Sequence, residues 1–211
     1  MRTLGLTMAQ LPLTPDKIPT REQLVALIGI EDPLLLAIRG HQAIDALLTT
    51  AITSALPDPH QVEVERLSFT LKVDLAVALK RIPQDCRGMF TALNRVRNRL
   101  THDAAAALDE QTAAEIRSAY AAPQRESFSH LIDRPGAPVY TLQLLVGILF
   151  QQLRVLLQQT LDHAIEEQVT SEILREALED YEKRNPNQNL DPISKEFSEK
   201  IAQRKSEIYK T

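Results

Sequence analysis

Prolines and helix-capping residues divide this chain of 211 residues into segments with helical rather than strand-like hydrophobic spacing. Asp32 and Pro33 form an N-cap followed by a proline at the first helical position, and Thr20 with Gln23 forms a capping-box pair. The chain is poor in strand and turn formers, since aromatic residues make up 4% of it, Trp is absent and there are 6 Gly. The sequence therefore predicts an all-α fold.

The positions of the helix breakers predict three regions. Residues 1–19 contain three prolines and are expected to form an irregular N-terminal arm, residues 20–183 a helical bundle, and residues 184–211 a C-terminal extension with one amphipathic helix. The expected helices cover residues 20–30, 33–56, 68–82, 84–101, 110–120, 140–183 and 192–208, with 124–132 left open and 134–138 assigned to a loop.

The last expected helix has an apolar stripe that needs a surface to pack against. Its members are Ile193, Phe197, Ile201 and Ile208. We expect this helix to dock on the bundle or on a second subunit, and a role as a partner-binding helix is the alternative.

The cysteine content and the hydropathy pattern bear on the compartment of the protein. Cys86 is the only cysteine, so no internal disulfide can form and a reducing compartment is expected. Residues 1–9 lack the sustained apolar run of a signal peptide. The most apolar window, 142–149, lies in a stretch interrupted by Gln and Arg that is too short for a membrane span, so a buried core helix is expected. We therefore expect a cytoplasmic protein without membrane contact.

Positive charge is concentrated in one short segment of an otherwise acidic chain. The formal net charge is −4 at pH 7. Residues 80–99 hold six basic side chains and one acid, Asp85, which leaves 18 of the 24 basic and 27 of the 28 acidic residues for the rest of the chain. A basic segment on an acidic protein favours a local site for an anionic partner over general binding of polyanions.

The stretch Arg97–His102 at the end of this basic segment is the strongest candidate for chemistry. An apolar stripe recurs at spacings of four, three and four residues along the helix expected here: Met89, Leu93, Val96 and Leu100. On a helical wheel Asn98 and His102 lie about 40° apart on the polar side, and Arg97 lies at the edge of the stripe. We therefore expect a site on a helix surface that faces another helix or a second subunit.

These residue types suit proton transfer beside a phosphate. Histidine side chains titrate near neutrality, at about pH 6.5, and arginine stays charged and matches phosphate oxygens with its planar fork. Asn98 could orient the imidazole or bind substrate. Cleavage of RNA by its own 2′-hydroxyl requires such groups and no metal ion. The five histidines form no tight ligand cluster in the sequence, so no metal or cofactor is expected.

An Arg and a His five residues apart is a weak signal without its surroundings. The same spacing recurs at Arg125 and His130, where no apolar stripe accompanies it. The alternative interpretation of Arg97 and His102 is a solvated polar face with a histidine at the helix end.

The surroundings resemble proteins of the HEPN-domain superfamily. Residues 93–103, Leu-Asn-Arg-Val-Arg-Asn-Arg-Leu-Thr-His-Asp, are similar to the "LNxxRNxxxH" signature of that superfamily. Upstream, residues 38–47 resemble the early HEPN helix that carries an acidic residue facing the site. Residues 67–79 resemble the "LSFxxKxxLAxAL" helix of one branch. The resemblance covers residues 31–103, and nothing specific is identified in the second half of the chain.

The resemblance implies a HEPN-like helical bundle that forms a homodimer in which two RNxxxH motifs face each other. For active members it implies metal-independent endoribonuclease activity, often in toxin–antitoxin or antiphage systems. The partners it implies are RNA, a second copy of the chain, and an antitoxin or regulatory protein. Carried over to this sequence, Arg97 would bind the scissile phosphate, Asn98 would be the polar residue beside it, and His102 would be the general acid and base.

Four further side chains are candidates for supporting roles. His41 and Asp45 lie four residues apart on one helix face, which favours a structural hydrogen bond between them, and a role in supporting the site from the early helix is the other interpretation. Arg95 and Arg99 are expected to contact RNA, with a solvated face as the alternative. The sequence departs from the usual pattern at Asp45, where Glu is commoner, and at Thr101, where a small apolar residue is usual.

Many proteins of this superfamily are not nucleases. The mannitol operon repressor family has a similar Arg-to-His spacing and consists of regulators that do not cleave RNA. A non-catalytic helical regulator or interaction protein is therefore the alternative function. Cleavage of RNA by the purified protein in EDTA would separate the two.

Overall fold

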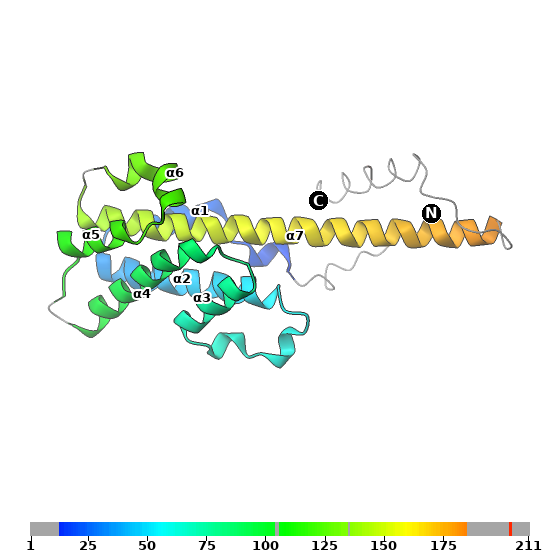
Figure 1. Ribbon diagram of the computed structural model, residues 1–211, viewed down its shortest axis with the longest axis horizontal. Helices are drawn as coiled ribbons and strands as arrows, with labels where there is room; N and C mark the ends of the chain where they lie inside the picture. Colours follow the sequence, from blue (N-terminus) through cyan, green and yellow to red (C-terminus); the bar gives the residue numbers. More distant parts are fainter. Residues whose placement is uncertain (1–12, 104–105, 135, 185–202, 204–211) are drawn as a thin grey trace. The chain divides into compact units, whose positions relative to one another are not determined.

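The computed structural model describes residues 13–103, 106–134, 136–184 and 203. Within these residues the chain forms seven α-helices and no β-strand, which confirms the all-α prediction (Figure 1). The helices are α1 (Arg21–Ile28), α2 (Pro33–Thr53), α3 (Phe69–Ala78), α4 (Arg87–His102), α5 (Glu110–Ser118), α6 (Ala122–Ile132) and α7 (Pro138–Arg184). The helix expected over 192–208 lies, except for residue 203, outside the described residues, as do residues 1–12 of the expected arm.

Side-chain caps set the first residues of α1 and α2 where the sequence predicts them. The Thr20 hydroxyl accepts a hydrogen bond from the backbone N–H of Gln23, whose side chain accepts one from the Thr20 backbone N–H. Before α2, the carboxylate of Asp32 accepts from the backbone N–H of Leu35 at 2.6 Å. Each cap satisfies a backbone N–H that has no partner within its helix. The capping predictions are therefore confirmed.

Helix α3 ends four residues earlier than expected, at Ala78, because the chain reverses there through a left-handed residue. Lys80 has a φ of 57°, a conformation in which glycine is the usual residue. Its N–H donates to the carbonyl of Val77 at 2.9 Å, and the N–H of Arg81 donates to the carbonyl of Ala76 at 2.8 Å. This pair of bonds is a Schellman motif, and it is formed well before Pro83.

Other helix boundaries also differ from the sequence prediction, and the undecided segment is helical. Helix α4 begins at Arg87, because Gln84–Cys86 form a separate 3-10 turn before it. Helix α2 ends at Thr53, three residues early. The undecided segment 124–132 belongs to α6, which is kinked at Phe128.

The chain consists of two compact units. Residues 12–158 form one unit, which holds α1 to α6 and the first part of α7. Residues 1–11 and 159–211 form the other, and its described part is almost entirely the remainder of α7. Between residues 161 and 173 the side chains at every fourth position are buried: Leu161, Ile165, Val169 and Ile173.

Helix α2 is the centre of the unit formed by residues 12–158. It packs against α1, α3 and α4, and the three helices α2, α3 and α4 are in mutual contact (Figure 1). On another side Gly40 lies so close to α7 that an added Cβ atom would meet Cγ2 of Val146 at 2.7 Å. The side chains of α2 buried in this core are Leu36, Ala37, Ile44, Leu47, Leu48, Ala51 and Ile52.

Helix α7 is the one described helix whose length and composition would allow it to cross a membrane. Its segment Pro138–Ala177 contains an 18-residue window with a mean hydropathy of 1.4, and 44% of that window is buried in the structure. A core helix of a soluble protein meets the same criterion. Leu142, Leu145 and Leu149 are each 0% exposed, as a core helix requires.

We predict that Gly40→Ala destabilises the protein, although alanine favours helices. The added methyl group would overlap the β-branched side chain of Val146. Overpacking costs about 1–3 kcal/mol and the gain in helix propensity is at most about 1 kcal/mol, so a net loss of about 1–2 kcal/mol is expected in urea unfolding. Gly147→Ala is the matched control, because its Cβ would meet Ile28 at an ordinary 3.5 Å. Equal effects of the two substitutions would contradict the close approach at Gly40.

Candidate functional site

Helix α4 presents the candidate residues on the side opposite its buried stripe. Met89, Leu93 and Val96 of the predicted stripe are buried, and Leu100 is half-buried. Asn94, Asn98 and His102 follow one another at four-residue intervals and form a polar row along the helix. The row changes from half-buried at Asn94 and Asn98 to exposed at His102, and Arg97 lies half-buried beside it.

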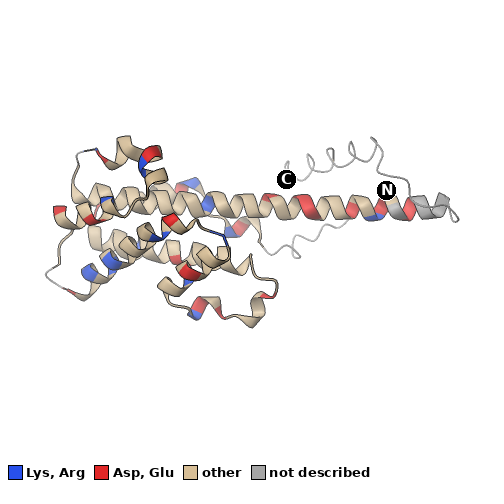
Figure 2. Cartoon of the chain, viewed as in Figure 1, with Lys and Arg blue, Asp and Glu red and all other residues tan. Residues whose placement is uncertain are grey.

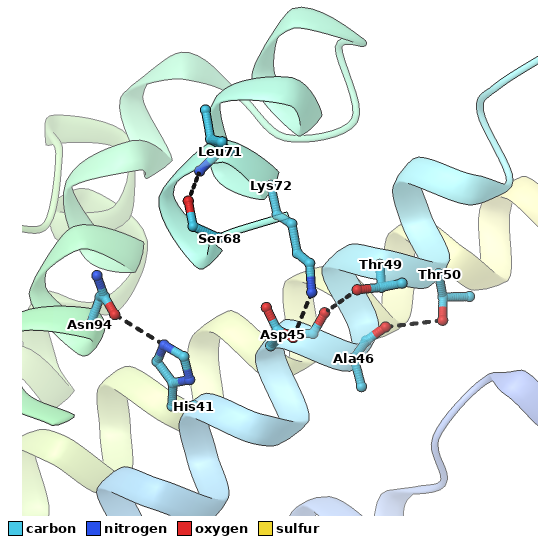
Figure 3. Close-up of polar contacts among 9 residues, drawn as sticks. All are labelled: His41, Asp45, Ala46, Thr49, Thr50, Ser68, Leu71, Lys72 and Asn94. Carbon is cyan, nitrogen blue, oxygen red and sulfur yellow. Dashed lines mark hydrogen bonds and ion pairs between the residues drawn. The ribbon is translucent and has the colours of Figure 1, made fainter. Parts of the chain in front are cut away.

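His41 reaches the polar row from α2. Its Nε2 atom lies 3.1 Å from Oδ1 of Asn94 (Figure 3). Its ring packs on the ring of Phe69 at a centroid distance of 4.2 Å. The ring is therefore held by α4 at its edge and by α3 at its face. These contacts place His41, a predicted supporting residue, against α4, the helix that carries Arg97.

Asp45, one turn further along α2, is paired with a buried lysine. Oδ2 of Asp45 lies 2.7 Å from Nζ of Lys72, whose side chain is 3% exposed while that of Asp45 is 32% exposed (Figure 3). Among the described residues, no hydrogen bond joins Asp45 to His41. The predicted hydrogen bond between His41 and Asp45 is therefore wrong, because each side chain has a closer partner on a neighbouring helix.

The surroundings of His41 favour its neutral form. Removal from water lowers the pKa of His41 below its ordinary value of 6.5, while the hydrogen bond to Asn94 raises it. The positive charges of Arg97 and Lys72 lower the pKa further, and the negative charge of Asp45 raises it. Desolvation has the largest effect and the net shift is downward, so the imidazole is neutral at pH 7.

Arg97 is oriented by its neighbours on α4. One guanidinium nitrogen donates to Oδ1 of Asn98 at 2.8 Å. The hydroxyl of Thr101 donates to the backbone carbonyl of Arg97 at 2.8 Å. Thr101, the departure from the usual motif, is thus accommodated by a hydrogen bond to the preceding turn of the helix.

The two flanking arginines of the motif have different surroundings. Arg99 donates to the hydroxyl of Thr112 at 2.6 Å and pairs with Glu115 at 2.9 Å, so it links the end of α4 to α5. In the part of the chain that the structure describes, Arg95 and Arg97 have no acidic partner. Figure 2 shows the arginines of α4 in blue along the helix. Of the two predicted RNA contacts, Arg95 is the one whose charge is not engaged by an acid.

Three residues of the site are absent from the sequence prediction: Asn94, Lys72 and Phe69. All three lie in the segments that resemble HEPN proteins, Asn94 as the second residue of 93–103 and the other two within 67–79. The motif therefore contained a signal for them. Periodicity alone could not assign them, because Lys72 and Phe69 lie on the buried side of α3.

Two other candidate features in the described residues are also accounted for. Cys86 is buried and accepts a hydrogen bond from the side-chain amide of Gln124 at 3.1 Å. Burial raises the pKa of the Cys86 thiol to about 11, so the thiolate is disfavoured at neutral pH. Among the described residues, no group of three or more His, Cys, Asp or Glu side chains could hold a metal ion.

Comparison with known proteins does not add to this picture. No family model, no curated protein and no solved structure matches the chain. The interpretation of the site therefore rests on the motif residues and on the contacts that α2 and α3 make with α4.

We predict that Asp45→Asn destabilises the protein more than Lys72→Met does. Without Asp45 the ammonium group of Lys72 would remain buried and unpaired, whereas without Lys72 the carboxylate of Asp45 keeps partial contact with water. Because Asp45 is about one-third exposed, we expect losses of roughly 2 kcal/mol for Asp45→Asn and below about 1 kcal/mol for Lys72→Met. Urea unfolding at pH 7 measures both values. The reverse order would contradict the argument from burial.

We predict that part of the acid sensitivity of folding comes from His41. Its folded-state pKa lies below the unfolded value, so its contribution is complete above about pH 6.5 and is lost as the pH falls through the folded pKa. The free energy of unfolding should therefore decline less steeply between about pH 6.5 and 5 in His41→Gln than in the wild type. Gln42→Ala, at the exposed neighbour, is the control and should keep the wild-type slope. A steeper decline in His41→Gln would contradict the sign of the shift.

Proposed function

We propose that this protein is a metal-independent endoribonuclease of the HEPN type, which cleaves RNA through the RNA's own 2′-hydroxyl. The observation that carries the proposal is the polar row of α4, with Arg97 beside it and exposed His102 at its end. An imidazole and an arginine are the groups that this reaction requires, and Arg97 has no acidic partner among the described residues.

The proposed reaction assigns one role to each motif residue. His102 accepts the proton of the 2′-hydroxyl, and the 2′-oxygen attacks the adjoining phosphorus. The bond from phosphorus to the 5′-oxygen breaks, the 5′-oxygen takes a proton, and a 2′,3′-cyclic phosphate remains. Arg97 stabilises the negative charge that develops on the phosphate oxygens. Asn98, which accepts a hydrogen bond from Arg97, keeps the guanidinium group in place.

A homodimer would complete this site. One chain offers a single His102, but the reaction needs a group that takes a proton and a group that gives one. In an isologous dimer with α4 near the twofold axis, the partner subunit's His102 would protonate the leaving 5′-oxygen. The exposed end of α4 is compatible with such an approach.

The proposed activity suggests a cellular setting. An RNase without a metal requirement is active wherever RNA is present, so a cell that contains it needs a means to restrain it. We therefore extend the proposal to a cytoplasmic toxin or antiphage component that is controlled by an antitoxin or regulatory protein.

The proposal predicts RNA cleavage that survives EDTA and leaves 2′,3′-cyclic phosphate ends. His102→Ala should lower the cleavage rate by at least about 100-fold, the lower limit for a general acid–base group. Gel analysis of labelled RNA measures the rate, and sedimentation of the active protein should show a dimer. His130→Ala is the matched control, because His130 is also exposed and lies five residues after an arginine.

Two outcomes would contradict this function. RNA with a methoxy group at every 2′-position lacks the nucleophile, so its cleavage would exclude the mechanism. Absence of cleavage across a broad panel of RNAs would favour the non-catalytic regulator instead.

A further inference from the structure

The two asparagines of the polar row are oriented in the same way. Oδ1 of Asn94 faces Nε2 of His41, and Oδ1 of Asn98 accepts from a guanidinium nitrogen of Arg97. A side-chain amide has one acceptor oxygen and an NH₂ group with two donors. In both residues the acceptor is engaged by a group of the protein itself.

The NH₂ groups of the same two residues have no protein acceptor within the part of the chain that the structure describes. Figure 3 shows the amide nitrogen of Asn94 on the side away from His41. Asn94 and Asn98 are both half-buried, so these donors are partly open to solvent. They lie on one side of α4. Arg97 comes between the two asparagines in the sequence. The surface thus offers donors and positive charge.

The tautomer of His41 determines which end of the Asn94 amide it binds. The carbonyl oxygen of Asn94 faces Nε2 and can only accept, so this geometry corresponds to the tautomer with its hydrogen on Nε2. Because the surroundings keep the imidazole neutral, this is its single N–H group. The ring packs on that of Phe69 at a centroid distance of 4.2 Å. In this tautomer His41 holds the amide with its NH₂ group directed away from α2.

We propose that Asn94 binds a phosphodiester group of RNA through its side-chain NH₂, next to Arg97, and that His41 is the positioning residue that holds this amide in the binding orientation. Nonbridging phosphate oxygens only accept hydrogen bonds, which matches a surface of donors. The assignment rests on the proposed function for its substrate class, since it takes the ligand to be RNA. It adds a phosphate contact that does not depend on the catalytic step.

The test measures binding rather than cleavage. The full-length protein is titrated onto a fluorescent RNA with a methoxy group at every 2′-position, and Kd is measured by anisotropy at several salt concentrations. Loss of a hydrogen bond to a charged group predicts a Kd about tenfold higher for Asn94→Ala. His41→Phe keeps a ring beside Phe69 but cannot donate, so it should raise Kd to a similar extent. Gln42→Ala, at an exposed neighbour on α2, is the control and should leave Kd unchanged.

The double variant separates positioning from a merely structural role. If His41 acts through Asn94, His41→Phe adds no further loss to Asn94→Ala. His41→Gln, which can still donate to Asn94, should recover most of the affinity, provided that its melting temperature shows a folded protein. Asn94→Ala should leave the slope of log Kd against log salt unchanged, whereas Arg97→Ala should lower it by about one.

Each failure has a distinct meaning. Unchanged Kd in Asn94→Ala, independent losses that multiply in the double variant, or no binding of the 2′-methoxy RNA by the wild type would each overturn the phosphate assignment. If the binding effects are as expected but ordinary RNA is never cleaved, the assignment stands and the nuclease proposal fails.

Discussion

Enclosure of α2 by its neighbours is the constraint on which the other features depend. The helix contacts α1, α3 and α4, and it approaches α7 closely at Gly40. A polar side chain on such a helix must find a hydrogen-bond partner or lose the free energy of hydration. Asp45 meets this requirement with Lys72, and His41 meets it with Asn94. Burial of α2 thus brings an imidazole to the surface of α4.

The ion pair and the aromatic contact on α3 act together. Lys72 and Phe69 are three residues apart, so they lie on the same side of α3. A buried ion pair is weak evidence for stability, since desolvation offsets much of the attraction between the charges. It nevertheless favours rotations of α3 that turn Lys72 toward α2, where its Nζ lies 2.7 Å from Oδ2 of Asp45. The same rotation places Phe69 against the ring of His41.

Local signals in the sequence predicted the parts of the fold that local chemistry determines. The capping residues before α1 and α2 and the apolar stripe of α4 are of this kind. The end of α3 was predicted incorrectly, because Pro83 is a clear stop signal and a lysine in a left-handed cap is not. Segment 124–132 could not be assigned, since its helix is irregular at Phe128 and carries little apolar periodicity.

The positions of the site residues along α4 could be predicted from the sequence, whereas their contacts with residues of other helices could not. The wheel placed Asn98 and His102 on the polar side, and the structure shows Asn98 half-buried and His102 exposed. The pairing of His41 with Asp45 was the natural prediction for residues four apart, and it failed because partners from α3 and α4 lie closer. Separation along one helix can be read from a sequence, whereas the choice between competing partners depends on how three helices pack.

The close approach of α2 and α7 also restricts how this sequence can diverge. An added carbon atom at position 40 fits only if position 146 has a smaller side chain than valine. The two positions are therefore not independent, although they are far apart in the chain. Homologous sequences should keep glycine at the first position wherever the second is β-branched, and should change the two together.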